Sequence, residues 1–148
     1  MAGSAPEVYP QGNDILVVVH EPERRERIVR LLADEGFAVT AAAEGLAALR
    51  ASADRRLGLV VAAMDLPGSL DGPTTVRQAR QHHPGLKVLY TGEPAVRPAL
   101  SNPDTEDFIA APFERHELIG CVFELLHREA GGEAADLGRR VRAELRAS

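Results

Sequence analysis

The sequence predicts an α/β fold built on a doubly wound parallel sheet of five strands, and three observations support this prediction. Short apolar runs alternate along the chain with segments whose apolar residues recur at helical spacing. Glycine and proline mark most of the boundaries between them. Strands that alternate with helical crossovers form parallel sheets with helices on both faces. The 148 residues are enough for one such domain with its own core.

The first half of the chain is predicted to supply three strands and two helices. An apolar run, Ile15–Val19, predicts a buried strand. A helix follows from Pro22 to about Glu35, because proline suits a first helical turn and Gly36 is a typical terminator. The remaining elements of this half are strands over 37–42 and 57–63 and an alanine-rich helix over 44–53.

The second half continues the alternation but contains one weak helix. Strands are predicted over 86–90 and 108–110, and helices over 73–82 and 114–127. The segment 93–103 should hold another helix, yet it contains Pro94, Pro98 and Pro103. Proline inside a helix costs about 3 kcal/mol, so this helix should be short, shifted or poorly ordered. Five strands and five helices fit the flavodoxin-like order 2-1-3-4-5, in which function lies beyond the carboxyl ends of the strands.

Both ends of the chain are predicted to lie outside this domain. Residues 1–13 show little periodicity and indicate a flexible leader, so the domain covers 14–128. Residues 129–148 indicate a C-terminal helical extension, and two interpretations stay open: a frayed terminal helix or a contact with a partner. This extension is too short for a further domain, so any output is expected to be a contact made by the folded surface.

Composition narrows the classes of function. Apolar residues make up 45% and charged residues 26% of the chain, as in ordinary soluble proteins. No apolar run approaches the roughly 18 residues of a membrane span, and no secretory signal is present. The single cysteine, Cys121, excludes an internal disulfide and predicts a cytoplasmic location. A net charge of −5 argues against nucleic acid as a partner.

Four segments carry a family resemblance. They are ILVVVHEP at 15–22, LVVAAMDLPGSLDG at 59–72, VLYTGE at 88–93 and FIAAPF at 108–113. In this order and spacing the chain resembles the receiver domain of two-component response regulators over roughly residues 14–128. The resemblance implies a site where an aspartate ending the third strand takes a phosphoryl group from a phosphohistidine. A magnesium ion held by two acidic residues, a hydroxyl and a lysine would neutralise the oxygens.

At most of these implied positions the chain has residues that can neither accept a phosphoryl group nor bind magnesium. The acidic pair falls on Val19 and His20, followed by the acidic Glu21; the phosphoacceptor falls on Ala63 and the lysine on Ala111. Alanine has no nucleophile, valine binds no metal, and imidazole is a poor magnesium ligand. The hydroxyl position keeps Thr91 and the aromatic switch position keeps Phe108. We expect Thr91 to bond local backbone, and we expect no metal and no cofactor.

Lysine content gives an independent check. The only lysine, Lys87, is predicted to begin the fourth strand, at the end of the sheet opposite the site. No other lysine can replace the missing one. The Ala111–Pro112 peptide bond is expected to be cis, as is usual in the family the chain resembles.

These residues predict a non-phosphorylatable, single-domain response regulator, a pseudo-receiver rather than an enzyme. It would act by protein–protein interaction in two-component signal transduction, with a sensor histidine kinase, another response regulator or a second copy of itself as partner. In the family the surface near 94–102, 107–111 and 114–127 commonly serves dimerisation and output. The interaction surface is therefore predicted to include Phe108, Glu117, Val122 and Leu125.

Two alternatives remain open from the sequence. Asp65, two residues past Ala63, is an unconventional phosphoacceptor in the first. The second is a small-molecule-sensing pseudo-receiver that uses the emptied pocket between Val19, Ala63 and Ala111, where small apolar side chains could admit a ligand. A flavodoxin-like enzyme is disfavoured, because no glycine-rich phosphate-binding loop follows a strand.

Overall fold

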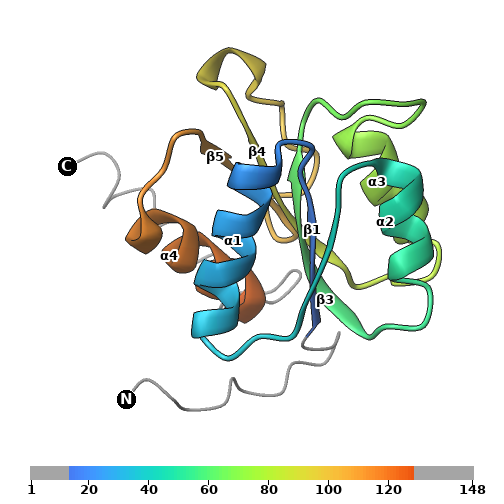
Figure 1. Cartoon of the computed structure of the whole chain (residues 1–148), viewed down its shortest axis with the longest axis horizontal. Helices are drawn as coiled ribbons and strands as arrows, with labels where there is room; N and C mark the ends of the chain where they lie inside the picture. The colour runs from blue at the N-terminus through green and yellow to red at the C-terminus, as the bar shows by residue number, and fades with distance from the viewer. Residues whose placement is uncertain (1–13, 129–148) are drawn as a thin grey trace.

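A computed structural model describes residues 14–128, and this part of the chain forms a five-stranded parallel sheet with four α-helices (Figure 1). The strand order β2-β1-β3-β4-β5 confirms the predicted topology. The strands are β1 (Asp14–Val18), β2 (Val39–Ala42), β3 (Leu57–Ala63), β4 (Lys87–Gly92) and β5 (Glu106–Ala110). The helices are α1 (Pro22–Asp34), α2 (Gly45–Ala51), α3 (Gly72–Ala79) and α4 (Arg115–His127).

Helices cover both faces of the sheet, with α1 and α4 on one side and α2 and α3 on the other (Figure 1). Side chains of successive strand residues point to opposite faces, so one set of alternate residues packs under each pair of helices. Val17 and Val61 belong to the core under α1 and α4, whereas Val18 and Val60 belong to the core under α2 and α3. The strands are therefore buried on both faces, which explains their continuous apolar runs.

The boundaries of α1 follow the sequence signals. Pro22 stands in the first turn, where the missing N–H costs nothing. Gly36 has a φ of 96°, a left-handed conformation that favours glycine and turns the chain towards β2. The Ala111–Pro112 peptide bond is cis, as expected.

The helix expected within 93–103 is short, as predicted: in the described residues the segment between β4 and β5 contains only a 3₁₀ helix, η1 (Pro94–Val96), so the sheet is covered by four α-helices. Proline at 94 and 98 prevents a longer helix, as the sequence indicated. The chain compensates with a different contact: the Arg97 guanidinium lies 4.6 Å from the centre of the Phe108 ring, a cation–π arrangement. Phe108 is only 4% exposed beneath it.

Buried charged groups gather at the amino ends of β4 and β5. Lys87 begins β4, as predicted, and its Nζ donates to the carbonyl oxygens of Leu125, Leu126 and Arg128 at the end of α4. Arg128 forms an ion pair of 3.0 Å with Asp107. These contacts join the end of α4 to strands β4 and β5.

Glu106 belongs to the same end of the sheet. Burial acts to raise the pKa of Glu106, but the hydrogen bond from Arg80 and those from the Asn102 and Ser101 amides outweigh burial and lower it. The carboxylate thus stays ionised where it fixes the loop that replaces the expected helix.

The predicted leader (1–13) and the C-terminal helical extension (129–148) lie outside the described residues. Among the helices of residues 14–128, none is long and apolar enough to cross a membrane.

Candidate functional site

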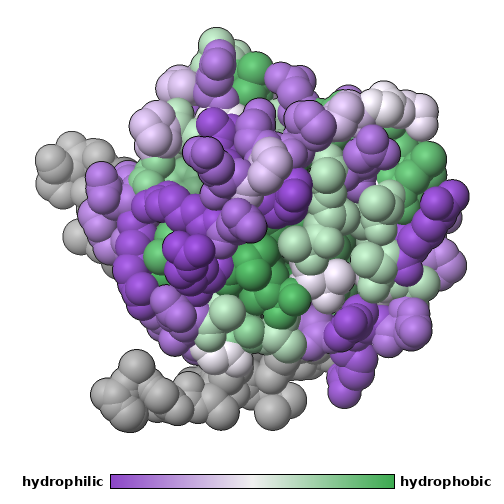
Figure 2. Space-filling model, in the orientation of Figure 1, coloured by the Kyte–Doolittle hydropathy of each residue, from purple (hydrophilic) through white to green (hydrophobic). Residues whose placement is uncertain are grey.

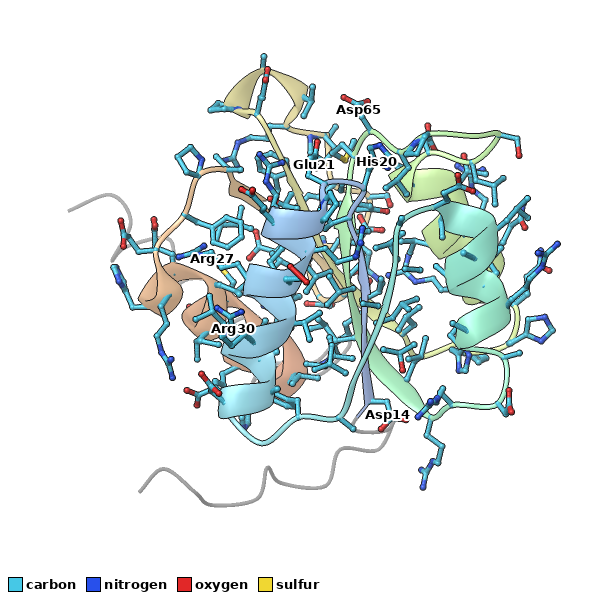
Figure 3. All side chains as sticks on the ribbon, viewed as in Figure 1. Asp14, His20, Glu21, Arg27, Arg30 and Asp65 are labelled. Carbon is cyan, nitrogen blue, oxygen red and sulfur yellow. The ribbon has the colours of Figure 1, made fainter. Side chains whose placement is uncertain are left out.

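The carboxyl ends of the parallel strands meet at one edge of the sheet and leave a hollow of about 770 Å³. Residues from β3, from the β4–η1 segment, from the loop after β5 and from the start of α1 line it; we call this cavity the hollow. Strand pairing places Ala63 beside Thr91 and Ala110 beside Gly92. Three labelled residues, His20, Glu21 and Asp65, lie at this edge, at the top of the view (Figure 3).

The floor of the hollow is made of small side chains. Ala63 is 8% exposed and lines the hollow together with the half-buried Ala111. Val19 is fully buried in the neighbouring core. None of these three side chains carries a carboxylate or an ammonium group, so Ala63 and Ala111 bring neither a carboxylate nucleophile nor a charge to the floor. The pocket predicted between Val19, Ala63 and Ala111 is therefore lined by Ala63 and Ala111, whereas Val19 does not line it.

Thr91 departs from the sequence-based expectation. Its side chain is 0% exposed, it lines the hollow, and its Oγ1 has no hydrogen-bond partner within residues 14–128. The expectation that this hydroxyl bonds local backbone is therefore wrong. The nearby Thr91 carbonyl accepts from the Met64 N–H and the Gly92 carbonyl accepts from the Ala111 N–H, but neither accepts from the Thr91 hydroxyl. A buried hydroxyl without a partner costs roughly 1–3 kcal/mol.

Replacement of Thr91 by valine is expected to raise the free energy of unfolding by about 1 kcal/mol, because valine has nearly the same shape and removes the unpaired hydroxyl. Urea unfolding measures the change. Thr75→Val is the matched control: Thr75 is equally buried, but its Oγ1 donates to the Asp71 carbonyl at 2.8 Å, so this variant should lose stability. Equal losses in both variants would contradict the assignment of an unpaired hydroxyl at Thr91.

Charged side chains form the rim of the hollow, and hydrophilic residues surround the top of α1 in the space-filling view (Figure 2). Arg24 and Glu21 form an exposed ion pair of 3.7 Å. The Arg27 guanidinium lies 5.5 Å from the centre of the Phe113 ring. The other members of the rim are exposed carboxylates: Glu23, Asp65 and Glu93.

Arg25 fixes the loop between β1 and α1, a role that sequence reasoning missed. Its Nη1 donates to the Val19 carbonyl at 2.9 Å and to the His20 carbonyl at 3.0 Å. A basic residue one turn into a helix is common on a solvated surface, so the sequence carried no signal for this contact. His20 is exposed, and its side chain makes no hydrogen bond or ion pair with residues 14–128.

A magnesium ion, which the family resemblance implies, does not fit this site. Magnesium requires a set of oxygen ligands in near-octahedral geometry. Val19 and Ala63 supply none, and the structure brings no group of three or more His, Cys, Asp or Glu side chains together anywhere in residues 14–128.

The predicted interaction surface needs correction. Val122 and Leu125 are both 0% exposed, because α4 turns this side to the sheet. Phe108 is buried as well. Only Glu117 is exposed, and its Oε1 accepts from the Glu114 N–H at 2.7 Å in a capping box at the start of α4. Sequence periodicity identified the apolar side of the helix but not which side faces a partner.

Comparisons with known proteins agree with this fold. The family model described as "Response regulator receiver domain" matches residues 15–123. The chain is 31% identical over 117 residues to the probable transcriptional regulatory protein TcrX of Mycobacterium tuberculosis, covering 77% of this chain and 50% of that protein. It is 32% identical over 125 residues to the response regulator MprA of Mycobacterium sp. strain KMS, covering 82% and 54%. The chain thus spans about half the length of these relatives.

Among solved structures, the receiver domain of NtrX from Brucella abortus aligns with a TM-score of 0.66 and 31% identity, covering 78% of this chain and 100% of that domain. The receiver domain of the hybrid histidine kinase CckA aligns with a TM-score of 0.65 and 26% identity, covering 77% and 99%.

Proposed function

The chain belongs to the response-regulator receiver family, and on this premise we propose that it is a receiver that is not phosphorylated and signals by binding a protein partner. The observation that carries the proposal is the floor of the hollow. Ala63 stands where the phosphoacceptor is expected, and Ala111 stands where the lysine is expected. A site without nucleophile, metal ligands and compensating cation has no means of taking up a phosphoryl group.

The partner is a sensor histidine kinase or another response regulator of a two-component pathway, and the chain competes with, sequesters or scaffolds it in the cytoplasm without acting as an enzyme. Neither nucleic acid nor a membrane is required.

Self-association as a homodimer belongs to the same proposal. Because Val122 and Leu125 are buried, such a dimer would use exposed parts of α4, near Glu117, rather than its apolar side. A single monomeric species in light scattering at high protein concentration would exclude the dimer.

Incubation with a small-molecule phosphodonor and magnesium is expected to leave the intact mass of the protein unchanged. Ala63→Asp alone should also remain unmodified, because the acidic pair and the lysine are still absent. A receiver that retains the phosphoacceptor aspartate, the acidic pair and the lysine is the positive control for the donor. A gain of one phosphoryl group in the wild type would overturn the proposal.

Asp65 is the specific alternative that this measurement tests. It is exposed and lines the hollow, so a phosphodonor could reach it. A phosphoryl gain that disappears in Asp65→Ala would assign an unconventional receiver. The second alternative, a small-molecule sensor, would appear as a ligand of defined mass in native mass spectrometry of the freshly purified protein.

A further inference from the structure

The rim of the hollow carries more negative than positive charge. Four carboxylates and two guanidinium groups line it: Glu21, Glu23, Asp65, Glu93, Arg24 and Arg27. Arg24 is already paired with Glu21, and Arg27 lies over the Phe113 ring. Three carboxylates, on Glu23, Asp65 and Glu93, form neither an ion pair nor a hydrogen bond within the described part of the chain. The rim therefore attracts a cation and repels an anion.

The unpaired hydroxyl of Thr91 is a second and independent sign of a ligand. It is fully buried at the floor of the hollow, where no group of residues 14–128 satisfies it. A hydroxyl can donate to an anion or accept from an N–H group. The charge of the rim favours an N–H donor over an anion, because an anionic ligand would have to pass three uncompensated carboxylates. An N–H donor on a cation satisfies both the hydroxyl and the rim.

We propose that the hollow receives a basic side chain, lysine or arginine, from a partner protein. The inference rests on the proposed function, in which the chain acts by binding another protein. The aliphatic stem of the inserted side chain would lie against Ala63 and Ala111. Its charged end would donate to Thr91 Oγ1 once a small shift of the neighbouring groups uncovers this buried oxygen. The hollow, at about 770 Å³, is within the roughly 300–1,000 Å³ of ordinary ligand pockets.

This arrangement gives a physical reason for the retention of Thr91 beside two alanines. Position 111 has no lysine of its own, and Lys87 is held at the other end of the sheet by carbonyl groups of α4. The partner would thus supply from outside the positive charge that this edge of the sheet lacks. A metal cation fits less well, because the rim carboxylates do not form a group of three potential ligands.

The test uses Nα-acetyl-lysine methylamide as the probe and the full chain labelled with ¹⁵N. Titration is expected to shift the backbone amide resonances of Thr91, Gly92 and Asp65 in a saturable way. Nα-acetyl-norleucine methylamide has the same stem without the ammonium group and is expected to produce no such shifts. Equal shifts with both probes would overturn the proposal, because the hollow would then select an apolar stem.

Variants locate the interaction. Thr91→Val should weaken binding of the lysine probe about fivefold, the effect of one lost hydrogen bond. Asp65→Asn should weaken it about two- to threefold. Asp54→Asn is the matched control, since Asp54 is also an exposed aspartate but lies before β3, at the opposite end of the sheet. If Thr91→Val binds the probe as well as the wild type, or if Asp54→Asn weakens binding as much as Asp65→Asn, the proposal is wrong.

The two proposals fail separately. A phosphoryl gain in the intact-mass measurement would overturn the proposed function whatever the lysine probe does. An absence of localised shifts with the lysine probe would overturn the present inference, while the protein could still bind a kinase or receiver through another surface.

Discussion

Replacement of Lys87 by methionine is expected to lower the free energy of unfolding by about 3 kcal/mol, one of the two largest effects that the structure predicts for a single substitution. Lys87 is 4% exposed, and its ammonium group donates to the Leu125 carbonyl at 2.6 Å and to the Leu126 carbonyl at 3.4 Å. It also donates to the Arg128 carbonyl. Methionine keeps the stem but leaves these carbonyls without their donor.

The position of the charge adds to this loss. The carboxyl end of a helix carries a partial negative charge, which a cation stabilises. Lys87 provides that cation from a neighbouring strand, so α4 ends on a group that is fixed by β4. Loss of the ammonium should loosen the last turn of α4 and the strand edge that it covers.

Guanidinium-induced unfolding of the Lys87→Met variant measures the effect. Arg115→Met is the control, because this variant also loses a cationic contact. The Arg115 guanidinium forms an ion pair of 2.6 Å with Glu35, but the Arg115 side chain is 51% exposed. An exposed pair of this kind contributes less than about 1 kcal/mol. Comparable losses in the two variants would show that burial does not amplify the role of Lys87.

The acylation rate of the Lys87 amine gives a second measurement, because Lys87 is the only lysine of the chain. An amine-acylating reagent should modify Lys87 slowly in the folded protein and at the rate of a free lysine in denaturant. The single side-chain product makes the protection factor easy to read by peptide mass. Fast acylation in the folded protein would contradict the buried position of the ammonium group.

Lys87 also illustrates what the sequence could and could not predict. Its place at the start of the fourth strand followed from the apolar run after it, and so did its distance from the hollow. Its partners could not be predicted, because the carbonyls that it contacts lie 38 to 41 residues further along the chain. Such contacts depend on how α4 is docked on the sheet, which local periodicity does not determine.

The hollow likewise has features that the sequence predicted and features that it did not. Ala63 and Ala111 were placed at one edge because the carboxyl ends of parallel strands must converge, and the pairing of Ala63 with Thr91 follows this rule. The state of the Thr91 hydroxyl was mispredicted, since the groups within its reach depend on how segments distant in the sequence pack around it. The exposure of α4 residues was mispredicted for a related reason. An apolar stripe is more often the side that packs on the sheet than the side that meets a partner.

Gly72→Ala is expected to destabilise the protein by about 3 kcal/mol or more, because a Cβ at this position would meet backbone rather than a movable side chain. It would lie 2.1 Å from the Ala63 carbonyl oxygen and 3.2 Å from Met64 Cα. Gly72 has no left-handed φ, so the cost is steric and not conformational. The same residue donates its N–H to the Met64 carbonyl at 3.0 Å, which holds α3 against the end of β3.

Gly120→Ala is the matched control for this steric argument. Gly120 lies in α4, and a Cβ there would meet no atom within 4 Å, so alanine should raise the free energy of unfolding by about 0.5–1 kcal/mol. Opposite signs for the two substitutions in denaturant unfolding would establish that close approach, not glycine's flexibility, is what Gly72 provides. If Gly72→Ala were as stable as the wild type, α3 would be able to retreat from β3. The floor of the hollow at Ala63 would then not be fixed by this contact, and the stability of the hollow would have to come from the strand ends alone.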